Sequence, residues 1–411
     1  MPIFRPRIAI AGGGPSGLAL GLLLHRRGID ATIYELRSKP TPGELAKPSG
    51  MLDLHEESGL RAIRECGLWD GFQAAVGDCS EATRVLNPDG VVLHADEGEL
   101  SYRPEIPRNA LTDLLVRNLS VDTIKWNHKI AGAERSRNAA TGATEITLDL
   151  GPDSGAATYD FVVGADGAWS RIRNLLSDVK PFYSGAQYVT ATLRHASTRH
   201  PRLVELNGTG TLCALGGGNG LMTHRGPQDS IRVYAAVSTP DEHWATTAGL
   251  AGKTAADIKT ALLGDGGPFR GWAPPLRDLL ATACDEDARD NPGRAADVTP
   301  LYMLPVGHGW EHRAGATLVG DAAHLMTPWA GEGVNLALWD SLDLARVLAA
   351  VPGVADAAAW QAALEPRVRE FEETMLARAA EKAEETARNK DLFLSENGAQ
   401  EMADMFKRFY G

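Results

Sequence analysis

The chain begins with two short apolar runs that flank an amphipathic segment. The apolar runs, residues 7–11 and 31–35, each predict a buried strand. Residues 18–27 carry the period of an amphipathic helix that ends before Gly28. Strand, helix and strand in this order predict a βαβ unit at the start of the chain.

The pattern that follows is mixed and changes near the middle of the chain. Helical periodicity predicts helices over residues 60–66 and 108–119. Apolar runs predict strands over residues 142–150 and 158–164. Between about residues 189 and 238, short alternating runs are separated by glycine-rich turns, which predicts an antiparallel sheet.

The last third returns to an α/β pattern after a less regular helical region that reaches about residue 290. Residues 316–319 predict a strand and residues 334–348 a helix. The tail is rich in Ala, Glu and Arg, and predicts a long amphipathic helix over residues 360–388 and a shorter one over residues 391–411. These elements predict a nucleotide-binding domain built from both ends of the chain, with a second domain inserted between them.

The composition is that of an ordinary globular protein with room for two domains. The 411 residues are 44% hydrophobic and 23% charged. A formal net charge of −12 gives no general attraction to nucleic acid or to an anionic membrane surface, so neither is expected as a partner. We expect a monomer or a weak dimer that acts on a small molecule.

Neither the cysteines nor the apolar runs indicate export or a membrane span. The cysteines are Cys66, Cys79, Cys213 and Cys284. None belongs to a CxxC pair, so free thiols in a reducing compartment are expected. Glycines and a proline interrupt the apolar run over residues 8–24, and no other stretch approaches the ~20 apolar residues of a membrane helix. A soluble cytoplasmic protein is therefore expected.

The turn between the first strand and the first helix has the spacing GxGxxG. It reads Gly12-Gly13-Gly14-Pro15-Ser16-Gly17. In such a turn Gly12 allows the tight bend, Gly14 lets the backbone approach a pyrophosphate, and Gly17 lets helix and strand pack closely. The start of the following helix then faces the phosphates. Glu35 ends the second strand, where its carboxylate can accept from ribose hydroxyls. Together these features predict a dinucleotide site and leave NAD or FAD open.

Two further motifs each follow a predicted strand. Residues 161–173 contain Asp166-Gly167, and residues 316–335 contain Gly320-Asp321. With the amino-terminal GxGxxG, these motifs stand in the order found in class A flavoprotein monooxygenases, the para-hydroxybenzoate hydroxylase family, which this sequence resembles. The resemblance implies that the dinucleotide is FAD. In that family Asp166 helps to position the flavin pyrophosphate. A carboxylate there can also form a turn or cap a helix, because a helix is predicted to start at Ser170 and Arg171.

The resemblance also implies a fold. We expect an α/β protein with an FAD-binding Rossmann-like domain of the para-hydroxybenzoate hydroxylase type, an inserted antiparallel-sheet substrate domain and a long C-terminal helix. The FAD-binding domain is predicted to span residues 1–178 and 299–365, and the substrate domain residues 179–298. Residues 366–411 are predicted to form a helical segment that bridges the two.

The residues around the third motif fit flavin binding. Asp321 ends a strand, where its carboxylate can hold a hydroxyl of the ribityl chain. The next segment, which opens a helix, is Pro328-Trp329-Ala330-Gly331-Glu332-Gly333-Val334-Asn335. Its backbone N–H groups would point at the pyrimidine end of the isoalloxazine, where negative charge develops on reduction. Gly331 and Gly333 would let the backbone lie against the ring. The alternative is a structural loop before a helix.

A narrower resemblance links the chain to the tetracycline-inactivating monooxygenases. It rests on residues 50–55, 108–111 and 324–331, which read GMLDLH, RNAL and HLMTPWAG. In that group the matching aspartate and arginine contact FAD, which implies the same for Asp53 and Arg108; for the arginine, a surface salt bridge is the alternative. Two positions depart from the group. Leu36 replaces an arginine, with Arg37 one step on, and Lys47 lies beside the position of a basic residue thought to meet NADPH.

The same resemblance suggests where substrate would bind. Gln187 matches a glutamine that contacts the antibiotic. In that group an arginine and a histidine also contact the antibiotic. Here Thr211 and Tyr234 occupy the corresponding positions, so these polar contacts with tetracycline are not reproduced. With Trp329, these residues are the candidate substrate contacts.

We expect no metal site and no catalytic side chain. The histidines show no metal-ligand spacing, no nucleophile elbow occurs, and His324 is expected to be a structural hydrogen-bonding residue. The resemblance implies that NADPH or NADH reduces the flavin and that O2 then forms a C4a-hydroperoxide. This species would hydroxylate an aromatic or polyketide-like, tetracycline-type small molecule. The alternatives are a non-oxygenating flavin oxidoreductase of the same fold and a non-enzymatic FAD-fold binding protein.

Overall fold

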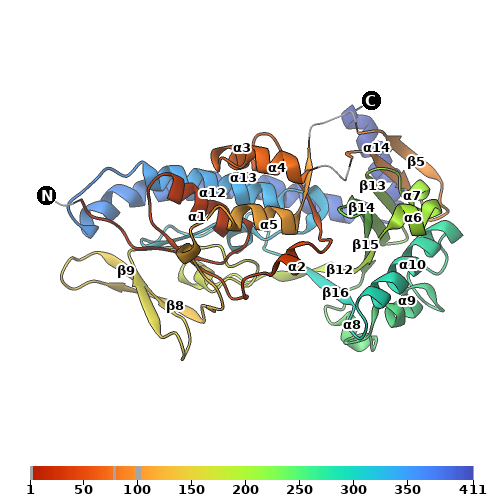
Figure 1. Cartoon of the computed structure of the whole chain (residues 1–411), viewed down its shortest axis with the longest axis horizontal. Helices are drawn as coiled ribbons and strands as arrows, with labels where there is room; N and C mark the ends of the chain where they lie inside the picture. Colours follow the sequence, from red (N-terminus) through yellow and green to blue (C-terminus); the bar gives the residue numbers. More distant parts are fainter. Residues whose placement is uncertain (1–2, 77–79, 99–102, 411) are drawn as a thin grey trace.

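Two sheets stand at opposite ends of an elongated molecule (Figure 1). The structure is a computed structural model that describes residues 3–76, 80–98 and 103–410. A five-stranded parallel sheet belongs to the end that holds the N-terminus, and a seven-stranded sheet belongs to the other end. No helix in these ranges has both the length and the apolar character that a membrane crossing needs.

The five-stranded sheet is parallel throughout. In spatial order its strands are β17 (Ala316–Leu318), β11 (Phe161–Gly164), β1 (Ile8–Ala11), β2 (Thr32–Tyr34) and β7 (Ile124–Lys125). All residues of β1, β11 and β17 are buried, as expected for parallel strands covered on both faces. Helix α1 (Pro15–Arg26) connects β1 to β2, which confirms the predicted βαβ unit.

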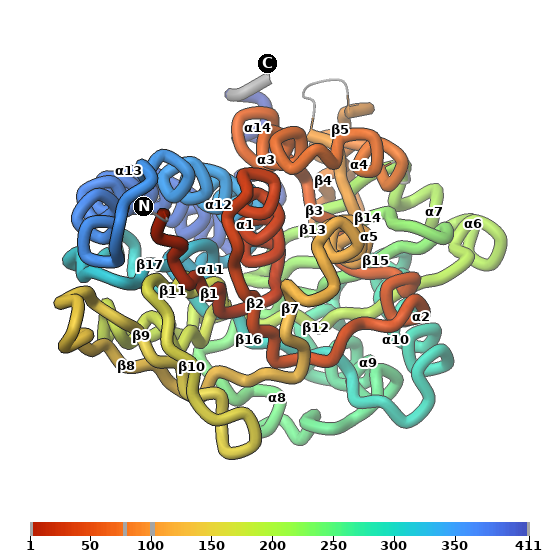
Figure 2. The backbone as a smooth tube through the Cα atoms, turned by 60° about the vertical axis from the view of Figure 1, so that its left-hand side comes forward, coloured from red at the N-terminus to blue at the C-terminus, as the bar shows by residue number. Residues whose placement is uncertain are grey.

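Helices from the two ends of the chain cover this sheet together. Helix α1 packs against α12 (Gly333–Ala349), which also contacts α3 (Gly59–Glu65) and α13 (Ala357–Phe393). Figure 2 shows α1 and α12 side by side above the strands, with α13 beyond them. The domain is therefore assembled from both ends of the chain, as the pattern of elements predicts.

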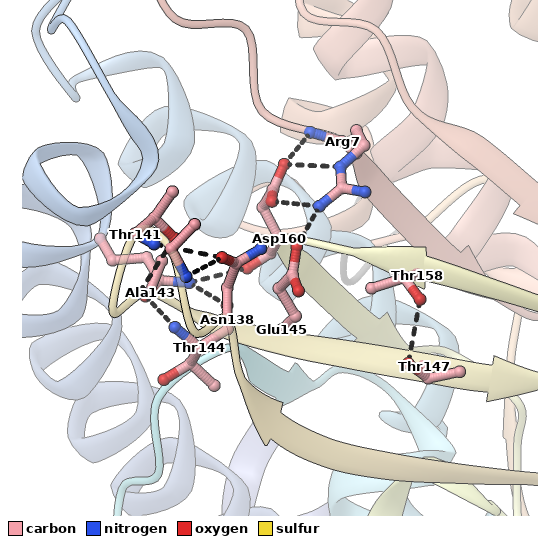
Figure 3. A network of polar contacts seen from close by, with 11 residues as sticks. Arg7, Asn138, Thr141, Ala143, Thr144, Glu145, Thr147, Thr158 and Asp160 are labelled. Carbon is pink, nitrogen blue, oxygen red and sulfur yellow. Dashed lines mark hydrogen bonds and ion pairs between the residues drawn. The ribbon is translucent and has the colours of Figure 1, made fainter.

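A small antiparallel sheet is attached to the parallel one. It consists of β8 (Gly132–Arg137), β9 (Thr144–Asp149) and β10 (Ala156–Tyr159). The prediction of one strand over residues 158–164 was wrong, because β10 and β11 lie in different sheets and separate at Asp160. This aspartate accepts the Arg7 backbone N–H at 2.7 Å, and the Arg7 guanidinium joins it to Glu145 of β9, at 2.7 Å from each carboxylate (Figure 3).

The seven-stranded sheet confirms the predicted antiparallel region and extends beyond it. Its strands in spatial order are β16 (Asp297–Met303), β12 (Phe182–Leu193), β15 (Ser230–Ser238), β14 (Asn219–Gly226), β13 (Thr211–Gly216), β4 (Thr83–Leu86) and β5 (Val92–Asp96). The pair β13–β4 is parallel and the other pairs are antiparallel. Strands β4 and β5 come from the range predicted for the FAD-binding domain, yet they pair in this sheet.

Helices interrupt the region that was predicted to hold strands alone. Between β12 and β13 lie α6 (Ala196–Arg199) and α7 (Pro201–Asn207), so that part of the prediction was wrong. Pro201 occupies a first-turn position of α7, where a missing N–H costs nothing, and Leu203 and Asn207 bury one face. The predicted helical region that follows consists of α8 (Trp244–Thr247), α9 (Ala255–Leu263) and α10 (Pro274–Asp290). Helix α10 packs on α9, β12 and β15.

The C-terminal helices reach from one sheet to the other. Helix α13 contacts α12 and α14 (Gly398–Tyr410), and α14 lies on β13, β4 and β5. The other short elements include β3 (Met51–Asp53), β6 (Glu105–Pro107) and α5 (Arg108–Val116). Helix α5 ends three residues before the predicted Leu119. Cys66, Cys213 and Cys284 are free and buried, and Cys79 lies outside the described residues.

Candidate functional site

The three sequence motifs meet in space. Gly12 has φ +107°, and a Cβ there would lie 2.2 Å from the Ala165 carbonyl oxygen, so this turn touches the Asp166 motif. On its other side, a Cβ at Gly320 would lie 3.0 Å from Ser16 Oγ. Gly320 also has a positive φ, of +60°, so both positions favour glycine through their backbone conformation as well as through the close approach. The turn thus lies between the Asp166 and Asp321 motifs.

Two helix starts near this junction face open space. Gly14 caps α1 and Gly333 begins α12. Among the described residues, no heavy atom outside the adjacent backbone lies within 4 Å of an ideal Cβ at either glycine. The first turn of a helix carries unpaired N–H groups and a partial positive charge. Both starts can therefore receive an anionic or electron-rich group of a ligand.

Asp321 begins α11 (Asp321–His324), directly after the turn at Gly320. Its residue surface is exposed to solvent, yet burial by the surrounding protein raises the pKa of its carboxyl. The charges of His324, Arg108 and Arg173 act in the opposite direction. Arg108 is itself exposed at the start of α5. An acceptor and a guanidinium thus face the same space.

Glu35 follows β2 and is tied to the glycine turn. Its Oε2 accepts the Gly13 N–H at 2.7 Å, and its Oε1 accepts from Arg37 Nε at 2.8 Å. Burial opposes ionisation, but the hydrogen bonds from Arg37 and Gly13 outweigh it and lower the pKa of Glu35. Leu36 is 60% exposed. Lys47 is also exposed, on the loop after α2 (Pro42–Leu45), and its carbonyl accepts from Asn109 Nδ2.

Asp166 acts in the structure as a cap. Its carboxylate accepts from Ser170 Oγ at 2.5 Å and from the Arg171 N–H at 2.7 Å, ahead of the turn η2 (Ile172–Leu175). The helix predicted to start there is this single turn. Arg173, which sequence reasoning did not single out, is 3% exposed and donates to the Asp321 and Ala322 carbonyls. It therefore joins the second and third motifs.

His55 lies at the centre of a buried charged network beside the loop at Gly331. Its Nε2 is 3.0 Å from Asp53 Oδ2 and its Nδ1 is 3.5 Å from Glu332 Oε2. Lys382 of α13 pairs with Glu332 at 2.5 Å. A Cβ on Gly331 would lie 3.1 Å from Asp53 Oδ2, which places Asp53 against the predicted flavin loop.

Asn335 fixes the backbone of the same region. It is fully buried, donates to the Asp53 carbonyl at 2.9 Å and accepts the His55 N–H at 2.9 Å. Val334, one residue earlier, is half-buried, and Pro328 is exposed at the start of the turn η3 (Pro328–Ala330). Hydrogen bonds to Asp53 and His55, in the N-terminal half of the chain, thus hold the start of α12 and the loop before it.

We expect the His55 network to stabilise the protein most at low pH. Burial opposes the imidazolium, but hydrogen bonds to Asp53 and Glu332 outweigh it and raise the pKa of His55 from 6.5 to about 9. The stability that the protonated His55 contributes is therefore complete below the pKa of about 6.5 that it has in the unfolded chain, and is lost as pH rises through about 9. His55→Gln should lower the free energy of unfolding by roughly 1–3 kcal/mol at pH 6. The difference from the unmodified protein should shrink towards pH 10, as measured by denaturant unfolding.

A difference that stays constant or grows with pH would contradict this assignment. His128, which is half-buried and bonds the Trp126 carbonyl, offers the matched control. His128→Gln removes an imidazole whose hydrogen bond, within the described residues, goes to a backbone carbonyl. The His55 network is left intact, so the pH dependence attributed to that network should persist in this variant.

A cavity of ≈ 270 Å³ opens beside Gly331. Its lining comes from β3–β6, the seven-stranded sheet, the loop before α12 and α14: Asp53, Glu81, Thr83, Asp96, Gly98, Arg103, Glu105, Thr211, His224, Ala330, Gly331 and Phe406. Thr211, a predicted substrate residue, is in this lining. The cavity therefore joins the predicted flavin loop to the predicted substrate sheet.

The other three predicted substrate residues lie elsewhere. Gln187 is buried and its Nε2 donates to the Asp241 and Glu242 carbonyls. Tyr234 is packed against Tyr188, with ring centroids 5.6 Å apart. Trp329 is 6% exposed and belongs to the apolar cluster between the sheet and the C-terminal helices. Each of these side chains packs within the protein and does not line the cavity.

His224 and Glu105 line the cavity, and sequence reasoning missed both. His224 is paired with Thr211 across β14 and β13, and Glu105 is paired with Asp53 across β6 and β3. The sequence gives little indication of either residue, because the residue opposite a given position on a neighbouring strand can be identified only once the register of the two strands is known. His324 fits its expected structural role, since its Nε2 bonds Asp340 at 2.6 Å inside the core.

The residues present fit FAD. Two open helix starts, a carboxylate tied to the glycine turn, and an exposed aspartate and arginine whose charges interact match the phosphate, ribose and ribityl groups of that cofactor. Gly14 and Gly333 would hold the pyrophosphate and the isoalloxazine edge. Glu35 would hold the ribose, Asp321 the ribityl chain and Arg108 a phosphate.

Comparisons with known proteins agree with this geometry. The family described as FAD binding domain matches residues 5–202 and 312–377. The monooxygenase penA of Penicillium thymicola is 34% identical over 433 aligned positions, which cover 98% of both chains. Among solved structures, Klebsiella pneumoniae HpxO complexed with FAD and uric acid has a TM-score of 0.74 at 20% identity, covering 98% of this chain and 92% of that one.

The tetracycline resemblance holds at the level of the fold. Tetracycline destructase Tet(51) has a TM-score of 0.66 at 16% identity, and the match covers 100% of this chain and 98% of that one. At an identity this low, the comparison shows a shared fold and nothing about the substrate.

Proposed function

Since this chain belongs to the FAD binding domain family and is an FAD-dependent monooxygenase, we propose that it uses NADPH or NADH and O2 to hydroxylate an aromatic or polyketide-like small molecule. The observation that carries the proposal is the cavity beside Gly331, which lies next to the predicted flavin loop. Its volume of ≈ 270 Å³ lies near the lower end of the range of ligand pockets and suits a molecule of one or two rings.

The protein's part in this reaction is binding, orientation and electrostatics. Bound FAD supplies the redox chemistry, which is hydride acceptance from the nicotinamide and activation of O2. The start of α12 would stabilise negative charge that develops at the isoalloxazine, since its N–H groups and dipole face that edge. Gly331 and Asp53 would lie against the edge of the isoalloxazine ring, on the side that faces the cavity.

Thr211 and the loop at Ala330 would position the substrate against that edge. For the nicotinamide cosubstrate we propose the exposed cations Arg37, which pairs with Glu35, and Lys47. Both carry charge suited to a phosphate. We also propose a cytoplasmic protein that acts as a monomer or weak dimer.

The proposed domain division is residues 1–178 and 299–365 for FAD and 179–298 for substrate. Residues 366–411 would join the two. Strand β4 pairs with β13, so residues 83–96 belong to the sheet of the substrate domain although they lie within the range 1–178. Strand β16 begins at Asp297, so the boundary between residues 298 and 299 falls inside a strand of the same sheet.

The test combines flavin content with oxygen consumption. The purified protein should be yellow, and its flavin should be reduced by NADPH or NADH under anaerobic conditions. On admission of O2, a phenolic substrate should raise NAD(P)H oxidation and yield a product that carries one atom from labelled O2. A protein that takes up no FAD would overturn the proposal. Flavin reduction without oxygen incorporation into any aromatic of a broad panel would favour a non-oxygenating oxidoreductase.

A further inference from the structure

The cavity beside Gly331 has an unusual charge. Among its described lining residues are four carboxylates, those of Asp53, Glu81, Asp96 and Glu105, against the single guanidinium of Arg103. Most of these acids have donors elsewhere. Glu81 accepts the Arg103 N–H at 2.7 Å, Asp96 bonds His94 at 3.2 Å and Asp53 bonds His55 at 3.0 Å.

Glu105 differs from the other acids of the lining. Its side chain is 11% exposed, and its Oε2 is buried with no hydrogen-bond donor among the described residues. Its ion-pair partner is His224, whose Nδ1 lies 3.5 Å from Oε2 and has no other hydrogen-bond partner in the described chain. This separation is long for a hydrogen bond, so a donor that enters the cavity would improve the hydrogen bonding of the Glu105 carboxylate.

The position of Glu105 is also electrostatically unfavourable. It stands directly opposite Asp53 in the antiparallel pair β6–β3. Like charges in such cross-strand positions repel each other. His55 pairs with Asp53 and His224 pairs with Glu105, so each imidazole offsets part of the repulsion. A cation placed in the cavity would relieve both together.

We propose that Glu105, with His224 beside it, selects a small aromatic substrate that carries a protonated amine. The proposal rests on the hydroxylase function given above and narrows its substrate class. The ammonium group donates to the Glu105 carboxylate, and the ring lies towards Ala330 and Gly331, against the flavin edge. An aromatic carboxylate of the same size meets the same acids and is repelled.

The experiment compares two phenols of similar length that end in opposite charges, tyramine and phloretate. Isothermal titration calorimetry on the FAD-loaded protein gives both dissociation constants. Tyramine should bind at least about tenfold more tightly than phloretate, because a hydrogen bond between charged groups is worth a factor of that order. Glu105→Gln keeps the shape of the side chain and should remove most of this preference.

Glu134→Gln is the matched control. It removes the same charge from an exposed position on β8, outside the cavity lining, and should leave the preference unchanged. If both variants reduce the preference equally, net charge and not the cavity is responsible, and the proposal is overturned. Equal or tighter binding of phloretate, or no binding of tyramine, overturns it as well.

Flavin content and NAD(P)H-dependent flavin reduction are measured on the same samples. If FAD is bound and reduced but tyramine is not preferred, the amine proposal alone has failed. If the protein takes up no FAD, the proposed function has failed.

Discussion

Gly14→Val is expected to weaken FAD binding by about 10- to 100-fold while the fold stays intact. The backbone of Gly14 is extended, with φ −78° and ψ −178°, so valine fits the local conformation without strain. No heavy atom of the described chain outside the adjacent backbone lies within 4 Å of the added Cβ, so the folded protein accommodates it. The side chain then occupies the space that the pyrophosphate needs for close approach to the start of α1. Flavin content after desalting, and titration of the apoprotein with FAD, measure the effect.

Gly132→Val provides the control for this variant. Gly132 begins β8 at the edge of the small sheet, and a Cβ there also meets open space. It adds the same atoms far from the three motifs, so FAD affinity should not change. Full FAD affinity in Gly14→Val with an unchanged circular dichroism spectrum would show that the cofactor does not approach this turn.

Asp340→Ala is expected to lower the free energy of unfolding by about 3–5 kcal/mol. Asp340 is fully buried on α12 and accepts from His324 at 2.6 Å, from Arg378 at 3.0 Å and from the Gly320 N–H at 3.0 Å. Burial opposes the charge on His324, but Asp340 outweighs it and raises the pKa of that imidazole. Without the carboxylate, the His324 imidazole loses the group that stabilises its charge, the Arg378 guanidinium loses a partner, and the Gly320 N–H loses its acceptor. Urea unfolding followed by circular dichroism tests this.

Asp343→Asn tests whether burial is the cause. Asp343 also pairs with Arg378, at 3.2 Å, but its side chain is 27% exposed. A partly exposed ion pair contributes roughly 0–1 kcal/mol, so this variant should be close to the unmodified protein. If the two substitutions destabilise equally, the buried network is not what holds α12 to the Gly320 turn.

The parts of the fold that sequence could predict are those set by local pattern. The strands β1, β2 and β17 and the helices α1, α12 and α13 have clear periods, and the glycines at 12, 17 and 320 are required by close approaches that the motifs encode. The flavin side of the site follows from these elements, because each motif residue stands at the end of a strand or the start of a helix.

The substrate side could not be predicted in the same way. Strand β4 pairs with β13 more than a hundred residues later in the chain, and nothing in its own four residues indicates that partner. The residues facing the cavity depend on that pairing and on the register between Thr211 and His224. Trp329 shows what its motif alone leaves out. The motif predicts a place at the flavin, and the structure adds that the side chain packs in the apolar cluster between the sheet and the C-terminal helices.

The assembly of one domain from both ends of the chain has a consequence for biosynthesis. The turn at residues 12–17 leaves the ribosome early, but β17 and α12, which complete its sheet and cover α1, follow only at residues 316–349. At translation rates of about 5–20 residues per second, roughly 15–60 s pass between the two. During this interval the part of α1 that packs on α12 and the free edge of β11 have no native cover. The nascent chain therefore needs protection from aggregation in this period, and the cofactor can be captured only when synthesis is nearly complete.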